Sequence, residues 1–250
     1  MPSTNPNQLH NKTGNVVIHN KRLQILVKLA DKGHLESKKE LETINDLDTV
    51  FVLGNYYKDC KNENKDCNNC YVKFEMESIR WYEKASEISI KENGKPNCCA
   101  LLEIGKCYEA KKKYKTAIKY FRKASELGCN VAQYILGSFY ESGVAGSVDY
   151  KEAYRWYLKS AYKNNCCALY SLGKFHEYGI EVTKSNDIAF MYYSLSFSHN
   201  CALSQYALGK FYENGTIVSK NIDKAFELYE LSAEQGYSNA QCALGKLIFW

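Results

Sequence analysis

The stretch "AQYILGSFYESG" at residues 132–143 recurs as "ALYSLGKFHEYG" at 168–179 and as "SQYALGKFYENG" at 204–215. A shortened copy, "AQCALGKL", occupies residues 240–247. The glycine of each "LG" pair follows the previous one by 36 residues, at Gly137, Gly173, Gly209 and Gly245. Two related glycines precede these, Gly54 and Gly105, at less regular intervals. A period in the thirties indicates stacked helical pairs, so the sequence predicts an all-α solenoid of about five helix pairs.

Each repeat is predicted to begin with a helix that packs closely on its neighbours. Ala132, Leu136 and Gly137 share one helical face, because they are four and five residues apart. Glycine in a helix interior costs about 1 kcal/mol, so its recurrence indicates the close approach of another helix. A turn is predicted to follow, beginning at Gly143, Gly179 and Gly215.

A second helix is predicted in each repeat from its capping residues. The predicted N-caps are Asp149, Ser185 and Asn221. Glu152 stands three residues after Asp149, which is the spacing of a capping box. The second helices are predicted to end at residues that tolerate the left-handed conformation, namely Gly128, Asn164, Asn200 and Gly236.

The chain divides into three predicted parts. Residues 1–15 are predicted to be disordered, residues 16–48 to form a degenerate helical segment, and residues 49–250 to form the repeat array. The repeat units are predicted near 49–99 (with an insertion at 58–77), 100–131, 132–167, 168–203, 204–239 and, truncated, 240–250. The last unit presents apolar residues that a second helix would cover. The chain is therefore either a piece of a longer array, or it binds a partner or a second copy of itself through this end.

Composition and charge narrow the class of protein. The 250 residues are 45% hydrophobic, and a net charge of +5 comes from 33 basic and 28 acidic residues. A nucleic-acid-binding protein is usually more basic, with clustered charge. No apolar run is long enough to cross a bilayer, and the polar N-terminus lacks the apolar core of a secretory signal. We therefore expect a soluble, cytoplasmic protein whose 11 cysteines are reduced.

The stretch "ALGKFYENGTIVSKNIDKAFELYELSAEQG" at 207–236 resembles the Sel-one-like repeat family, whose pattern of Ala, Gly, Tyr and Lys it matches at many positions. The resemblance extends over about residues 49–250. The shorter unit, "YKTAIKYFRKASELG" at 114–128, resembles the related tetratricopeptide (TPR) repeat. The resemblance implies a right-handed superhelix of antiparallel, TPR-like helix pairs, and an adaptor that holds other proteins on its concave face.

The chain departs from the family pattern in the turn between the two helices of a repeat. The second glycine of that turn is replaced by Ala145, Glu181 and Ile217. A β-branched residue is strained at positive φ. We therefore expect these turns to adopt another conformation.

Two ladders of side chains are candidates for partner binding. Lysine follows the "LG" pair at Lys106, Lys174, Lys210 and Lys246. Stacking would align these lysines as a charged face, or they could form exposed pairs with glutamates three residues on. Tyrosine recurs every 36 residues at Tyr134, Tyr170 and Tyr206. These tyrosines could contact a partner, since tyrosine suits interfaces, or could pack between repeats.

Four of the cysteines are interpreted as packing residues, and no metal site is predicted. Cys60, Cys67 and Cys70 lie in the insertion, where "CNNC" has the two-residue gap of a zinc knuckle. A fourth ligand would have to come from Cys98, Cys99 or Cys107. The "CCA" runs at 98–100 and 166–168 are expected to supply small apolar residues just before the first helix. Some secreted bacterial proteins that resemble this fold carry a disulfide in each repeat, with a cysteine late in the second helix. This chain has Ser125, Ala161, Phe197 and Ala233 there, so the resemblance to those proteins fails at these positions.

Catalysis has little support in the sequence. The five histidines are scattered along the chain, and His176 is expected to be a core or groove substitution. The sequence contains no phosphate loop, nucleophile elbow or zinc-protease motif. We therefore predict a non-enzymatic adaptor without a cofactor, which binds protein partners and neither nucleic acid nor membrane. The alternative is a regulatory subunit or tail that activates an enzyme such as a kinase, a cell-wall synthase or a ubiquitin ligase of a quality-control complex. A small-molecule enzyme or metal protein is a third hypothesis.

Overall fold

Helix is the only regular secondary structure among the residues that the structure describes. The computed structural model describes the backbone of residues 21–63, 68–144 and 146–248, and the side chains of 23–59, 76–144 and 146–247. The predicted disorder of residues 1–15 and the side chains of Cys60, Cys67 and Cys70 lie outside the described residues. The helices are α1 (Lys21–Asp31), α2 (Leu35–Glu42), α3 (Leu47–Glu63), α4 (Asn68–Asn93), α5 (Cys98–Ala110), α6 (Tyr114–Glu126), α7 (Asn130–Ser142), α8 (Tyr150–Ala161), α9 (Cys166–Tyr178), α10 (Asn186–Phe197), α11 (Ala202–Asn214), α12 (Ile222–Glu234) and α13 (Ser238–Ile248).

The chain forms two compact units, Met1–Tyr120 and Phe121–Trp250. In the first unit, α1 packs on α2, and α3 packs on α4, which in turn contacts α5. Most of the predicted insertion at 58–77 is helical, because its residues extend α3 at its end and α4 at its start. The core of this unit is built around the fully buried Leu53, Tyr82 and Ile104.

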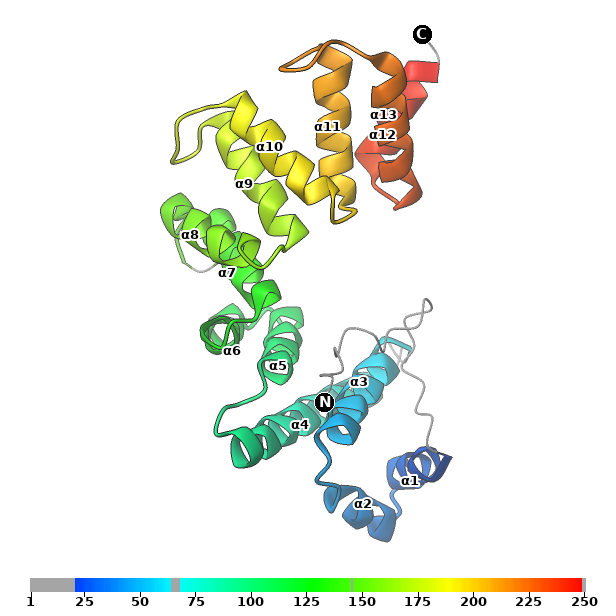
Figure 1. The fold of residues 1–250 in the computed structure, drawn as a ribbon. Coiled ribbons are helices and arrows are strands. Elements are labelled where there is room, and N and C mark those ends of the chain that lie inside the picture. The colour runs from blue at the N-terminus through cyan, green and yellow to red at the C-terminus, as the bar shows by residue number, and fades with distance from the viewer. Residues whose placement is uncertain (1–20, 64–67, 145, 249–250) are drawn as a thin grey trace, which may run out of the picture. The chain divides into compact units, whose positions relative to one another are not determined.

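In the second unit, successive antiparallel pairs pack on one another. The pairs are α7 with α8, α9 with α10 and α11 with α12, and α13 packs on α12 (Figure 1). Buried tyrosines connect each pair to the next: Tyr157 of α8 packs edge-on against Phe175 of α9, with ring centroids 5.8 Å apart. The predicted all-α fold of successive helix pairs is therefore confirmed.

The recurring glycine allows the two helices of a pair to approach closely, as predicted. A Cβ atom on Gly173 would lie 2.5 Å from Cε1 of Tyr193, and Gly137 and Gly209 have the same relation to Tyr157 and Tyr229. Among the described residues, no atom lies within 4 Å of the corresponding position on Gly245. The glycine therefore makes room for the tyrosine ring of the second helix.

Local capping chemistry begins and ends the helices where it was predicted to do so. Asp149, Ser185 and Asn221 are the N-caps of α8, α10 and α12, and each side chain accepts a backbone N–H three residues on. Only half of the predicted capping box forms, because the Glu152 carboxylate accepts from Arg155 at 2.6 Å and the Asp149 N–H donates to the Tyr140 carbonyl. The predicted helix ends are left-handed, at Gly128, Asn164, Asn200 and Gly236.

The expectation that the altered turns take another conformation is wrong for the two turns that the structure describes. Glu181 and Ile217 both remain left-handed, with φ of 56° and 68°, while Ala145 lies outside the described residues. Backbone hydrogen bonds hold both ends of the second turn. The Thr216 N–H donates to the Phe211 carbonyl and the Asn221 N–H to the Tyr212 carbonyl, at 3.0 and 2.9 Å. These bonds impose the geometry of the turn. Ile217 therefore adopts the left-handed conformation although its β-branched side chain is strained there.

Replacing Ile217 with glycine is expected to stabilise the protein. The left-handed conformation costs a non-glycine residue about 1–2 kcal/mol, and part of this gain is lost to the greater freedom of glycine in the unfolded chain. We expect a net rise of up to about 1 kcal/mol in the free energy of unfolding, measured by urea titration. Thr216→Gly is the matched control, since φ of Thr216 is not positive. A lower stability for Ile217→Gly than for the parent would contradict this account.

Candidate functional site

Two adjoining hollows lie along the first helices of the second unit. The first encloses about 430 Å³ and the second about 260 Å³, and they share Tyr170 and Lys174 of α9. We call the two together the α7–α9–α11 groove. Its lining residues are Tyr134, Ser138, Glu141, Ser142, Tyr150, Tyr157, Tyr170, Ser171, Lys174, Glu177, Tyr178, Tyr193, Leu203, Tyr206, Ala207 and Lys210.

The predicted tyrosine ladder both lines this groove and packs within the repeats. Tyr134, Tyr170 and Tyr206 are half-buried. Their rings lie 5.8, 5.4 and 5.5 Å from those of the buried tyrosines of the partner helices, Tyr157, Tyr193 and Tyr229. Burial raises the pKa of Tyr134 to about 12, so its hydroxyl stays protonated into the alkaline range. The ladder therefore presents fixed aromatic rings, and its role in partner binding stays a prediction.

The two lysines in the groove differ in how they are paired. The Lys174 ammonium lies 3.0 Å from Oε1 of Glu141, on the preceding repeat. Oε2 of the same carboxylate accepts the Tyr157 hydroxyl at 2.6 Å. Lys210 lines the second hollow and has no ion pair with any residue that the structure describes. Lys210 is therefore the cation that the groove offers to a ligand.

The remaining two predicted lysines lie elsewhere. Lys106 belongs to the first unit, where its ammonium is 2.8 Å from Glu103, a carboxylate that also binds Lys58. Lys246 is exposed on α13 and lines neither hollow. The structure thus brings together five of the seven predicted binding residues, all in the second unit.

Comparison with protein families identifies the repeat. The family model described as "Sel1 repeat" matches residues 75–88, 99–129, 130–165, 168–201 and 202–237, which together are more than half of the chain. The chain belongs to the Sel1 repeat family. Sel1 repeats generally mediate protein interactions, and the family is typically non-catalytic.

Solved structures of Sel1 repeat proteins share this fold. A Sel1 repeat protein from Oxalobacter formigenes is 24% identical, with a TM-score of 0.68 over 90% of this chain and 89% of that one. The protective antigen c5321 of uropathogenic Escherichia coli, which displays an SLR fold, is 23% identical, with a TM-score of 0.61 over 91% of this chain. The match covers 52% of that antigen, so the present chain corresponds to about half its length. A comparison with curated protein sequences gave no significant match. Among the described residues, no helix has the length and apolar character needed to span a membrane.

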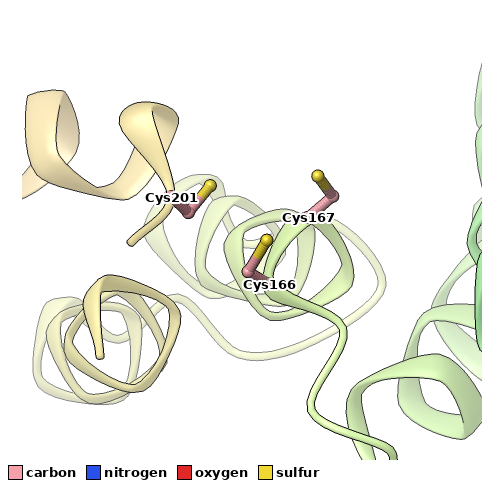
Figure 2. Close-up of side chains that lie close together, drawn as sticks. All are labelled: Cys166, Cys167 and Cys201. Atoms are coloured by element: carbon pink, nitrogen blue, oxygen red, sulfur yellow. The ribbon is translucent and has the colours of Figure 1, made fainter. Parts of the chain in front are cut away.

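In this Sel1 repeat array, three cysteines come together, and two of them, Cys166 and Cys167, were expected to be packing residues. Cys166 and Cys167 form the start of α9, and Cys201 is the N-cap of α11. Their sulfur atoms all lie within 4.8 Å of one another (Figure 2). A hydrogen bond from the Cys167 thiol lowers the pKa of Cys201 to about 5, and the same bond raises the pKa of Cys167.

The signal for this cluster was present in the 36-residue period. Ala202 is the register equivalent of Cys166, so Cys201 stands one residue before the corresponding point of the next repeat. Stacked repeats place the starts of successive first helices side by side. The register therefore places the three cysteines near one another, and the tertiary structure decides that their sulfur atoms meet.

His176 is a core substitution in the Sel1 pattern. Its side chain is 8% exposed, and its ring stacks on Tyr192 with centroids 5.6 Å apart. Nε2 lies 3.2 Å from the Tyr154 hydroxyl. Burial lowers the pKa of His176, so the ring is neutral at physiological pH. The residue takes the place of an aromatic side chain.

Proposed function

We propose that this Sel1 repeat protein is a non-enzymatic adaptor that binds an extended segment of a partner protein in the α7–α9–α11 groove. The observation that carries the proposal is the groove itself, in which tyrosines at a 36-residue period and Lys210 line one continuous surface. A cytoplasmic location, as expected from the sequence, belongs to the same proposal.

The groove chemistry favours a particular kind of segment. Tyrosine offers a large contact area at low conformational cost, because its ring has only two rotatable bonds. Tyr170, Tyr206 and Lys210 line the same hollow. Aromatic or aliphatic side chains of the partner would pack on these rings, and an acidic side chain would pair with the Lys210 ammonium.

Reversing the charge of Lys210 is expected to weaken partner binding by about tenfold or more, because like charges brought together at an interface are strongly unfavourable. The tagged chain is captured from its native cells, stoichiometric partners are identified by mass spectrometry, and the affinity of the purified partner is measured by titration. Lys174→Glu is a poorer test, since it would also remove the ion pair with Glu141.

Lys151→Glu is the matched control for this experiment. Lys151 is exposed on α8 and lines neither hollow, and its reversal changes the net charge equally. Equal loss of affinity in both variants would reduce the effect to general electrostatics, and no loss in Lys210→Glu would exclude the groove. An enzyme that co-purifies at fixed stoichiometry, and loses activity when this chain is removed, would instead indicate the regulatory role.

A further inference from the structure

The cysteine cluster of the second unit has the composition and geometry of a metal-binding site. Cys166, Cys167 and Cys201 each contribute one sulfur atom, and the three sulfurs lie within 4.8 Å of one another. Cys201 is buried, while Cys166 and Cys167 are half-buried. The cluster is thus partly withdrawn from water.

The backbone on both sides of the cluster is held by hydrogen bonds. The Ser196 hydroxyl of α10 donates to the carbonyl of Cys166 at 2.8 Å. The Ser204 hydroxyl of α11 donates to the carbonyl of Cys201, also at 2.8 Å. Asn165 caps the start of α9 by accepting the Ala168 N–H at 3.0 Å. The side chains of the cluster therefore project from anchored helix starts, which lowers the cost of ordering them around an ion.

We propose that Cys166, Cys167 and Cys201 bind a thiophilic cation, Zn²⁺, through three thiolates, with a fourth position open to water or to a partner. Thiolate ligands select soft and borderline metals such as zinc. Zn–S bonds of about 2.3 Å place the sulfurs of a tetrahedral site about 3.8 Å apart, so the cluster needs only a small contraction. A disulfide would use two of the three sulfurs, whereas a metal ion uses all three.

A bound ion would join two consecutive repeats at the edge of the groove. Cys166 and Cys167 belong to α9 and Cys201 to the start of α11, which are the first helices of neighbouring pairs. Leu203, two residues after Cys201, lines the first hollow of the groove. Because the metal binds the folded chain, its binding energy adds to stability. The site would therefore stiffen one wall of the groove.

Zinc content of the purified chain tests the proposal directly. The full chain is prepared under reducing conditions, loaded with Zn²⁺, dialysed and assayed by atomic emission. We expect about one zinc per chain, bound at the cluster. Cys201→Ser should weaken Zn²⁺ binding by more than the roughly 10–100-fold that loss of an outer-shell partner costs. The control is the triple variant Cys60→Ser/Cys67→Ser/Cys70→Ser, which removes the cysteines of the predicted insertion and should leave this zinc in place.

A second measurement on the unaltered chain keeps the proposal testable if the variants fold poorly. Zn²⁺ should slow alkylation of Cys166, Cys167 and Cys201 by N-ethylmaleimide at least tenfold, as followed by peptide mass spectrometry. The exposed Cys242 is the internal reference and should react equally with and without zinc. The proposal would be overturned if no zinc remains after dialysis, or if the zinc is lost in the control triple variant. It would also be overturned if zinc leaves alkylation of the cluster unchanged.

Discussion

Raising the pH above 10 is expected to unfold the second unit steeply, because its core contains three buried tyrosines. Tyr157, Tyr193 and Tyr229 are each at most 1% exposed. Burial, and donation of each hydroxyl to a glutamate, raise the pKa of all three above the usual value of 10. The accepting carboxylates are those of Glu141, Glu177 and Glu213.

The direction of the change in stability with pH depends on whether the folded or the unfolded chain binds more protons. Because the folded-state pKa is raised, the stabilising contribution of each tyrosine is complete below pH 10 and is lost as the pH rises toward the folded value. Above pH 10 the unfolded chain releases protons that the folded chain keeps. The free energy of unfolding should then fall by about 1.4 kcal/mol per pH unit for each tyrosine, or about 4 kcal/mol for the three.

Urea titrations at several pH values below and above 10 measure this slope, and Tyr193→Phe isolates one contribution. The variant should be less stable at neutral pH by about 1.5–3 kcal/mol, the worth of a hydrogen bond to a charged group. Its slope above pH 10 should be shallower than that of the parent by about 1.4 kcal/mol per pH unit. Tyr162→Phe is the control, since Tyr162 is 90% exposed and folding changes its surroundings little. Equal slopes for Tyr193→Phe and the parent would refute the assignment.

Adding one methyl group at the recurring glycine is expected to have opposite effects at two positions of the same register. In Gly173→Ala, the new Cβ would meet the fully buried ring of Tyr193 at 2.5 Å. Overpacking of this kind costs about 1–3 kcal/mol, because the buried ring would have to shift. This cost should exceed the gain of about 1 kcal/mol that alanine brings over glycine in a helix.

Gly245→Ala supplies the matched comparison, because no atom of the part of the chain that the structure describes lies within 4 Å of the added methyl group. Only the helix-propensity gain remains there, so we expect a rise of up to about 1 kcal/mol in stability. Thermal and urea unfolding of both variants measure the two effects, with circular dichroism to confirm that helix content is kept. A loss of stability in both, or in neither, would show that the tyrosine contact does not explain the glycine.

The sequence by itself determined the repeat, the helix pairs, their caps and the close contact at the glycine. These features depend on residues near one another in the chain or on a strict period. Asp149 caps α8 through an N–H three residues away, and Gly137, Gly173 and Gly209 each face a tyrosine 20 residues on. A local bond or a repeated spacing leaves a pattern that can be recognised in one sequence.

The tertiary structure alone decided which side chains meet between repeats. Lys174 pairs with Glu141, 33 residues earlier, rather than with a glutamate on its own helix. Ile217 keeps a left-handed turn because backbone bonds on both sides of the turn impose it. Cys201 joins Cys166 and Cys167 because neighbouring first helices start side by side. All three features share one physical reason. Each depends on the offset with which one repeat packs on the next, or on the closure of a turn. The preferences of single residues encode neither this offset nor the closure.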